Sequence, residues 1–420
     1  MRQDLPATAF RGFVGALVLL AATARATDAP GDADRAALVA GNAQLAFDLH
    51  ARLRGREGNL VHSPFSISQA FGMTFAGARG ETASQIARTF HFTLGPEQLH
   101  PAWHALDADL RDRKPRHDKN GSVIDPGAEL HVANALWLAK RYSFVPEFEQ
   151  TIVGDYGARL ERLDFSEEES ARQTINRWVK DETQERIVDL IPEGILGPLI
   201  RAVLTNAIYL KAAWLNPFQP AGTAKADFSV STKRRVSGVP FMRQIHEFPY
   251  LDGNGFQLLQ LPCWGRLSMI VILPKRLEDM AAIEKALTAA KLAEWSSKTT
   301  WRPVDVRLPK FEVTTELDLA EQLAAMGMSL AFSDDADFSG IAKERPLFID
   351  SVRHTARVSV EEAGIEAAAA TAVSVATKGG IDEGQTPVVF RADHPFIFLI
   401  RDDRTGSVLF VGRLTEPRPA

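Results

Sequence analysis

The sequence predicts an α+β protein, with helices concentrated in its first half and strands in its second half. Amphipathic helical patterns prevail near the N-terminus and strand-like apolar runs prevail toward the C-terminus. The two kinds of element do not alternate regularly, as they would in an α/β fold. A length of 420 residues suggests two or three domains, but no internal repeat or low-complexity linker divides the chain. We therefore expect one large domain over residues 27–420.

Small and apolar residues at helical spacing predict the helices. Segment 66–90 follows Ser63-Pro64 and is interrupted at Gly77 and Gly80, as expected for two packed helices. Segment 171–191 carries charge on one face. The segment 115–127 is rich in Pro, Gly, Asn and Asp and is predicted to be a loop. The predicted helices cover residues 33–56, 66–90, 96–114 and 171–191.

Apolar and β-branched residues predict the strands of the second half. Near the C-terminus, two apolar runs flank the turn "RDDRTGS" at residues 401–407, which predicts an antiparallel hairpin. The other predicted strands cover residues 130–140, 201–214, 225–231, 236–250, 256–262, 267–273, 303–313, 347–350 and 353–361.

The N-terminus has the pattern of a secretory signal peptide. Arg2 and Arg11 precede the apolar run 13–24, which is too short to span a bilayer comfortably. Small residues at Ala24 and Ala26 are typical of a cleavage site. A short buried helix is the alternative. We expect residues 1–26 to be removed and the protein to be secreted, to the periplasm or the medium, with no membrane association.

The charge pattern argues against nucleic acid as a partner. The net charge is −5, and one basic cluster is interleaved with aspartates. This cluster either binds a polyanion such as heparin or is a solvated helix end, which is the reading we favour. Its basic members are Arg111, Arg113, Lys114, Arg116, His117 and Lys119.

Motifs of common enzymes are absent from the sequence. There is no G-x-S-x-G, H-E-x-x-H, P-loop or G-x-G-x-x-G pattern, and we expect neither a metal nor a cofactor. The single cysteine, Cys263, lies between two apolar strand segments and is best explained as a small core residue. His62 and His354 lie in apolar surroundings and are interpreted as structural. A hydrolase with scattered catalytic residues stays a remote alternative.

The stretch "EEAGIEAAAATAVSVATKGG", residues 361–380, has two interpretations. Alanine is the best helix former, so the stretch is by itself compatible with an ordinary helix. The valines and the final Gly-Gly weaken that interpretation. As a strand, the stretch would place Ile365, Ala367 and Ala369 on one face and small or polar residues on the other.

Seven separate stretches, in the same order, resemble signatures of the serpin family and cover about residues 40–416. The combination is specific, whereas each piece alone would be weak. The stretches are "NLVHSPFSISQAF", "INRWVKDETQERIVDLI", "LTNAIYLKAAWLNPF", "LPKFEV", "DADFSGI", "VEEAGIEAAAATAV" and "HPFIFLIRDDRTGSVLFVGRL".

This resemblance implies the serpin fold: a large, mostly antiparallel central sheet, two further sheets, eight or nine helices and an exposed reactive centre loop. It also implies a monomeric suicide inhibitor that uses the catalytic serine of a target protease and supplies no catalytic group itself. The loop would cover about residues 362–390. Its hinge would consist of Glu362, Gly364, Ile365, Glu366, Ala367, Ala368, Ala369 and Ala370.

By the same resemblance, the cut bond lies about 16 positions after Glu362, between Lys378 and Gly379. A lysine at this position suits trypsin-like proteases, because a buried lysine needs an acidic partner. The loop is longer than in many family members, so the alternative positions Val375, Thr377 and Ile381 stay open.

Six further residues match conserved serpin positions. Ser63, Ser66, Asn206 and His354 would form a polar cluster beneath the opening sheet, and Lys310 and Trp214 would contact the loop where it begins to insert. Two departures from the family pattern are Ile365 in place of the usual threonine or serine and "KAAW" in place of Lys-Gly-x-Trp. A serpin-fold binding or carrier protein without inhibitory activity is the alternative function.

Overall fold

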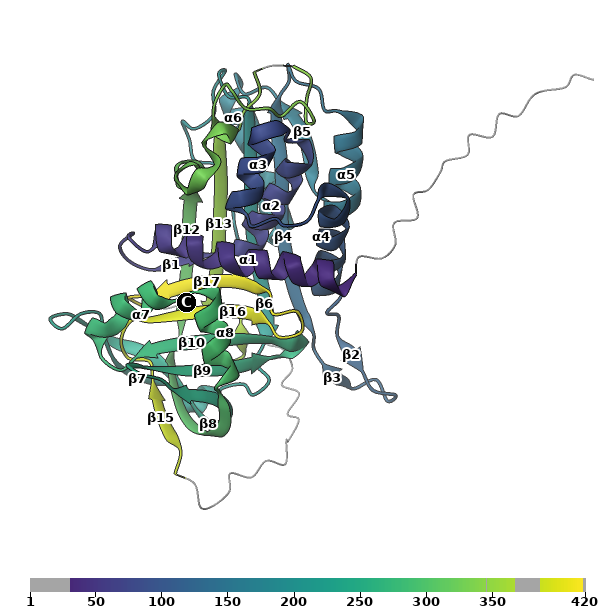
Figure 1. The fold of residues 1–420 in the computed structure, drawn as a ribbon. Helices are drawn as coiled ribbons and strands as arrows, with labels where there is room; N and C mark the ends of the chain where they lie inside the picture. Colours follow the sequence, from purple (N-terminus) through teal and green to yellow (C-terminus); the bar gives the residue numbers. More distant parts are fainter. Residues whose placement is uncertain (1–30, 345, 367–385, 418–420) are drawn as a thin grey trace, which may run out of the picture.

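The computed structural model describes residues 31–344, 346–366 and 386–417. Its helices and strands form two sheets and a helical layer, and the α+β prediction is confirmed (Figure 1). The N-terminal segment 1–30, with the expected signal peptide, lies outside the described residues.

Most helices come from the first half of the chain and gather beside the six-stranded sheet, whereas α7 and α8 lie against the other sheet (Figure 1). Helix α2 is apolar nearly all round because it is buried on all sides between α1, α4 and the sheets. The Ser63 hydroxyl accepts a hydrogen bond from the Ser66 amide and caps its start. The helices are α1 (Asp32–Leu53), α2 (Pro64–Gly77), α3 (Gly80–Thr89), α4 (Pro96–Arg111), α5 (Pro146–Tyr156), α6 (Glu168–Glu182), α7 (Met280–Ala286), α8 (Ala289–Ser297) and α9 (Ala320–Leu323).

The six-stranded sheet has the order β12-β13-β14-β6-β4-β5 and is mostly antiparallel. Only β13–β6 and β4–β5 pair in parallel. The long strands β4 and β6 are buried along nearly their whole length, because helix α2 packs against both and helices α4 and α6 pack against β4. The strands are β4 (Ala128–Ala139), β5 (Arg159–Leu163), β6 (Ala202–Ala213), β12 (Phe311–Asp318), β13 (Ser351–Val360) and β14 (Gly364–Ile365).

The second sheet has nine strands and bends along β8, whose first part pairs with β7 and whose last residues pair with β9. This bend separates the two further sheets that the sequence led us to expect. The strands are β1 (Leu60–His62), β7 (Ala224–Ser229), β8 (Arg235–Asp252), β9 (Phe256–Cys263), β10 (Leu267–Pro274), β11 (Thr300–Pro309), β15 (Val388–Arg391), β16 (Phe396–Asp402) and β17 (Val408–Leu414).

Several predicted elements differ from the observed ones for tertiary reasons. Segment 303–313 is two strands, because Lys310 leaves the ladder and its amide bonds to the Pro240 carbonyl. Segment 347–350 is not a strand: the Ile349 amide bonds to the carbonyl of Ala331 in a short helical turn. Helix α6 ends at Glu182 instead of residue 191.

Some elements were not predicted at all, or were predicted as loop. Segment 115–127 contains a short ribbon of β2 (Arg116–His117) and β3 (Val123–Asp125). Helices α5, α7 and α8 and strand β5 have short or mixed patterns that the sequence analysis did not identify. The C-terminal hairpin is confirmed, with β16 and β17 pairing antiparallel across the predicted turn.

Candidate functional site

The expected reactive loop starts after β13 in the six-stranded sheet and returns at β15 in the nine-stranded sheet. Its first residues, up to Glu366, and its last residues, from 386, are described. The expected cut bond Lys378–Gly379, its alternatives and the hinge alanines 367–370 lie outside the described residues. The visible part of the site is therefore the place where the loop begins to enter the sheet.

Strands β6 and β13 lie side by side in parallel over only part of their length. Residues 203–208 of β6 pair with residues 351–356 of β13. Beyond these pairs, β14 occupies the space between the two strands and runs antiparallel to both. Ile365 of β14 lies opposite Ala212 of β6 and Val360 of β13. The sheet thus has an opening, and the base of the loop already forms a short strand in it.

The two residues of β14 fit this opening closely. The Ile365 side chain is completely buried in the main hydrophobic core. At Gly364 a Cβ atom would lie 2.2 Å from the carbonyl oxygen of Ala212, so a side chain cannot be accommodated without moving the backbone. The apolar residue at position 365, unusual for the resembled family, therefore fills the core at the site where the strand starts.

A tight turn just before β14 anchors the hinge to three other segments. The Glu362 carboxylate lies 2.9 Å from Lys310 Nζ and accepts a hydrogen bond of 2.8 Å from the Thr223 hydroxyl. The Trp214 indole donates a hydrogen bond of 2.9 Å to the Glu361 carbonyl. The expected contacts Lys310 and Trp214 therefore both lie at the turn, and Thr223 is a third contact that the sequence did not indicate.

Electrostatics hold Glu362 in its charged form. Burial disfavours the ionised carboxylate, but hydrogen bonds from Lys310 and Thr223 outweigh that effect and lower the pKa of Glu362. The pair is only partly exposed, which reduces its screening by solvent and salt. The ion pair is therefore able to contribute to the stability of the turn at neutral pH.

Glu366, directly after β14, is a buried carboxylate next to two arginines. Its side chain is 3% exposed and lies 3.3 Å from Arg357 Nε and 3.8 Å from Arg186 Nε. Neither carboxylate oxygen has a hydrogen-bond partner among the described residues. Burial raises the pKa of Glu366 and the two arginines oppose this. The charge of Glu366 is thus poorly compensated in this position.

A buried polar network connects α2 with both strands that border the opening. The Ser66 hydroxyl donates a bond of 2.8 Å to Asn206 Oδ1 on β6. The His354 ring on β13 contacts the same oxygen through Nδ1, and its Nε2 accepts a bond of 3.2 Å from the Ser63 amide. The four residues of the expected polar cluster therefore lie together. His354 and Asn206 are partners within the parallel ladder, so these hydrogen bonds join the two strands shortly before the gap begins.

The network extends to residues that the sequence analysis did not identify. Asn206 Nδ2 donates to Asn134 Oδ1 on β4, and Asn134 Nδ2 donates a bond of 2.9 Å to Gln69 on α2. Asn134 interrupts the apolar run of β4, and a buried amide requires hydrogen-bond partners. That residue could therefore have indicated the extended network from the sequence.

Next to this network lies a pair of buried histidines. The rings of His62 and His50 stack with centroids 5.6 Å apart, and His50 Nε2 lies 2.9 Å from Glu284. Both ring nitrogens of His62 lack a hydrogen-bond partner among the described residues. Burial, reinforced by the nearby His50 and His354, holds the pKa of His62 well below its usual value. His62 is therefore structural and neutral.

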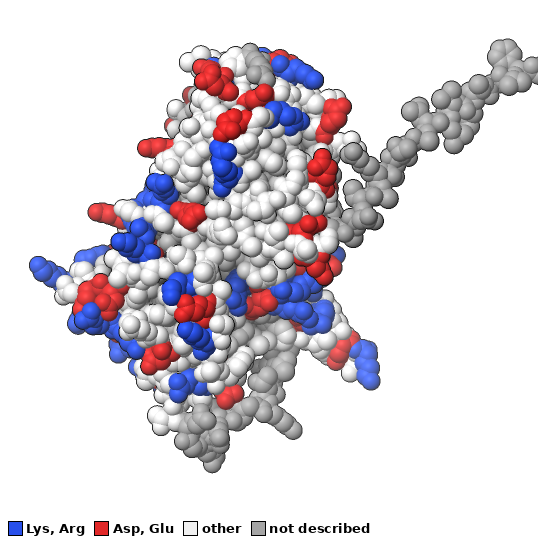
Figure 2. All heavy atoms as spheres, viewed as in Figure 1, with Lys and Arg blue, Asp and Glu red and all other residues white. Residues whose placement is uncertain are grey.

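The remaining candidates have ordinary roles. Cys263 is buried, and burial raises the pKa of its thiol. Basic residues of the 111–119 cluster pair with acids, as Arg111 does with Asp107 and Arg116 with Asp125. Figure 2 likewise shows acidic and basic side chains interspersed over the visible face. These pairs favour the interpretation as a solvated helix end.

Neither a metal site nor a membrane-spanning helix is present in the described part of the chain. No group of three or more His, Cys, Asp or Glu side chains in that part of the chain is arranged to hold a metal ion. No helix in the same part combines the length and apolar character needed to cross a bilayer.

Comparisons with known proteins agree with the geometry of this site. Residues 40–417 match the model of the family described as serpin (serine protease inhibitor). The chain is 37% identical over 392 residues to human leukocyte elastase inhibitor, covering 90% of this chain and 99% of the relative. It is 37% identical over 389 residues to human serpin B3, covering 90% of this chain and 98% of that relative.

The same architecture occurs in solved structures. Human thyroxine-binding globulin complexed with its thyroid ligand superimposes with a TM-score of 0.82 at 29% identity. The match covers 91% of this chain and 99% of that chain. The serpin fold expected from the sequence is therefore confirmed.

The relatives correct the expected location. The alignment covers 99% of human leukocyte elastase inhibitor but 90% of this chain. The inhibitor therefore has no segment that corresponds to the predicted signal peptide. Serpins B3 and B4 of human are aligned over 98% of their lengths. The expectation of a secreted, extracellular or periplasmic protein is contradicted by these relatives. The apolar run 13–24 satisfies a compositional pattern, and such a pattern does not itself determine where a protein resides.

We predict that the stability of the intact protein falls as the pH decreases below about 6.5. Burial lowers the pKa of His354 to about 3 and that of His62 well below its usual value. Both rings have a pKa of about 6.5 in an unfolded chain, so the unfolded state binds more protons than the folded state below that pH. The loss is up to ~1.4 kcal/mol per pH unit and ring. Urea unfolding midpoints measured at neutral and mildly acidic pH test this.

The matched variant for this experiment is His62→Phe, which retains a ring but cannot titrate. It should show a shallower fall of the midpoint with pH than the unmodified protein, because one buried ring no longer takes up a proton on unfolding. Parallel pH profiles for the two proteins would contradict the assignment.

We predict that Glu362→Gln destabilises the intact protein by about 1–2 kcal/mol, because it removes the charge that Lys310 neutralises while leaving an amide for Thr223. The measurement is the thermal unfolding midpoint. Glu361→Gln, one position earlier in the same turn, is the control and should have little effect. Equal midpoints for both variants would show that the ion pair does not hold the turn.

Proposed function

The chain belongs to the serpin family, and from this membership we propose that it is a suicide inhibitor of serine proteases. One serpin domain accounts for the whole family match over residues 40–417. The curated relatives include proteins named as protease inhibitors, which supports the inhibitory function over that of a carrier.

The observation that carries this proposal is strand β14. Its two residues lie in the opening between β6 and β13 and are hydrogen-bonded as part of the sheet. An inhibitor that traps its target by inserting a cleaved loop needs such an opening, because a new strand requires free backbone donors and acceptors on both sides. Strands β6 and β13 provide these groups beyond residues 208 and 356.

The residues that would follow β14 suit insertion. Ile365 faces the core, and successive residues of a strand point to opposite faces. Continuing the strand would direct Ala367 and Ala369 into the core and Ala368 and Ala370 outward. Methyl side chains obstruct least when a strand has to pass between two neighbours that are already packed. Insertion of the hinge is therefore sterically easy.

The proposed mechanism uses the chemistry of the target. The protease serine attacks the carbonyl carbon of Lys378, the bond to Gly379 breaks, and the lysine carbonyl stays esterified to the serine. The severed loop then inserts as a strand. At about 3.3 Å per residue, roughly 14 residues carry the attached protease about 50 Å. Distortion of the oxyanion hole during this movement would prevent water from releasing the ester.

The polar cluster is proposed to control when the sheet opens. Ser66 and His354 both bond to Asn206, so separating β6 from β13 breaks buried hydrogen bonds. Leaving such groups unpaired costs about 1–3 kcal/mol each, which opposes opening before cleavage. The same groups are able to bond again after the loop has inserted. The cluster therefore delays insertion without preventing it.

The target class is proposed to be trypsin-like, since Lys378 is the expected residue before the cut bond. A lysine side chain is accommodated where an acidic group lies at the bottom of the specificity pocket. The relatives include a protein named leukocyte elastase inhibitor, and cleavage after Val375 would instead suit a protease with a small apolar pocket. The position of the cut bond decides between these two classes.

We predict that mixing the protein with trypsin gives a covalent complex that resists SDS. Sequencing the released C-terminal peptide should begin at Gly379, and Lys378→Ala should abolish the trypsin complex because the pocket loses its cationic ligand. A peptide that begins at Ala376, together with a complex formed by elastase, would instead show that the target has a small apolar specificity pocket. Cleavage of the loop without any complex would contradict the inhibitory function.

We predict that a bulky charge on the core-facing side of the hinge turns the inhibitor into a substrate. Ala369→Arg would have to bury a guanidinium during insertion, which is slow enough for water to release the protease. Ala370→Arg is the matched control, because its side chain would point outward. Counting the protease molecules inhibited per inhibitor cleaved measures the difference. Equal values for the two variants would show that the proposed strand register is wrong.

A further inference from the structure

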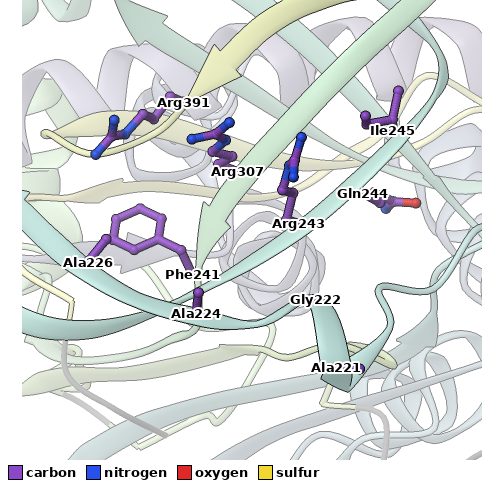
Figure 3. A pocket seen from close by; sticks show the side chains of 10 residues that line it. All are labelled: Ala221, Gly222, Ala224, Ala226, Phe241, Arg243, Gln244, Ile245, Arg307 and Arg391. Carbon is purple, nitrogen blue, oxygen red and sulfur yellow. The ribbon is translucent and has the colours of Figure 1, made fainter.

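A hollow of about 570 Å³ lies where β7, β8, β11 and β15 meet. Figure 3 shows three arginine side chains in a row along this hollow, with Phe241 nearby. The arginines come from different strands: Arg243 from β8, Arg307 from β11 and Arg391 from β15. The folded sheet therefore brings together charges that are far apart in the chain.

The hollow carries an excess of positive charge. Asp305 receives bonds of 2.8 and 3.0 Å from Arg243 and one of 3.1 Å from Arg307. One carboxylate thus serves two guanidinium groups, which leaves a net charge of about +1 for the three side chains. The hydrogen bonds from Arg243 also lower the pKa of Asp305, so this carboxylate is ionised at neutral pH. Arg391 has its own partner, Asp393, at 2.9 Å.

Donors remain available in the hollow. Arg307 Nε is buried and has no hydrogen-bond partner among the described residues. A guanidinium group has five N–H donors, and Arg391 forms an ion pair with Asp393 through Nε. Unused guanidinium donors on adjacent strands match the planar, two-oxygen geometry of a carboxylate or a phosphate.

One wall of the hollow, beside the arginines, is apolar. Phe241, two residues before Arg243 on β8, is 6% exposed, and Ala224 and Ala226 of the neighbouring strand β7 line the same end of the hollow. A ligand that uses the whole space would therefore have an acidic group at one end and an apolar body at the other. A bare inorganic anion would leave the apolar wall unused, and a neutral apolar molecule would leave the arginine donors unused.

We propose that this hollow is a binding site for an amphiphilic organic anion, with its carboxylate or phosphate group on Arg307 and Arg391 and its apolar body against Phe241. The bound anion would connect β11 to β15. Strand β15 is the last strand of the sheet and pairs only with β11 among the described residues, through residues 388–391. Binding is therefore expected to stabilise the C-terminal attachment of the loop. The inference does not depend on the proposed inhibitory function.

The test is calorimetric titration of the intact protein with phenyl phosphate and with benzoate. At least one of these anions should bind, and the stronger of the two identifies the preferred acidic group. Inorganic phosphate should bind about tenfold more weakly than the better aromatic anion, and benzyl alcohol should not bind measurably. Equal binding of inorganic phosphate and phenyl phosphate, or no binding of either aromatic anion at millimolar concentration, would overturn the proposal.

Variants locate the site. Arg307→Gln and Arg391→Gln should each weaken binding about tenfold, whereas Arg302→Gln, on the same strand β11 but outside the hollow, should leave it unchanged. Ala224→Glu places a negative charge in the hollow at an exposed position and should abolish binding, because its carboxylate repels the anion and competes for the arginine donors. Unchanged affinity in Ala224→Glu would refute the site even if the arginine variants proved unstable.

Discussion

The parallel pairing of β6 with β13 is the constraint on which the rest of this structure depends. Their ladder stops at residues 208 and 356, yet both strands continue, so backbone donors and acceptors face each other across a space. Such groups are obligatory hydrogen-bonding partners when they are buried. The chain satisfies those at the far end of the gap, at residues 212, 213 and 360, with its own next segment, Gly364 and Ile365. A sheet with such a gap is able to accept one more strand between β6 and β13.

Two polar features stabilise the partly open sheet. The hinge turn fixes the start of the inserted segment through Glu362, whose carboxylate has both a cationic and a hydroxyl partner. Below the gap, Asn206 accepts bonds from two neighbouring elements and prevents the strands from separating freely. Both features are polar and directional.

The two ends of the loop are attached to different sheets. The hinge belongs to the six-stranded sheet, whereas β15 is an edge strand of the nine-stranded sheet, held by pairing with β11. Cleavage between these ends would release the hinge side to insert while β15 keeps its place. The arginine-lined hollow lies at β15, so a ligand there would act on the end of the loop that does not insert.

Local periodicity in the sequence was sufficient to predict the α+β class, several of the helices and strands and the C-terminal hairpin. The resemblance to serpins, carried by short motifs, identified Glu362, Lys310 and His354 as residues of the hinge and of the polar cluster. The folded structure was needed to reveal that Lys310 interrupts a predicted strand, that Ile365 is already inserted and that His62 stacks on His50. The three arginines of the hollow likewise converge only after folding. These features depend on partners distant in the chain, and a residue's periodicity indicates which face it occupies but not what lies opposite it.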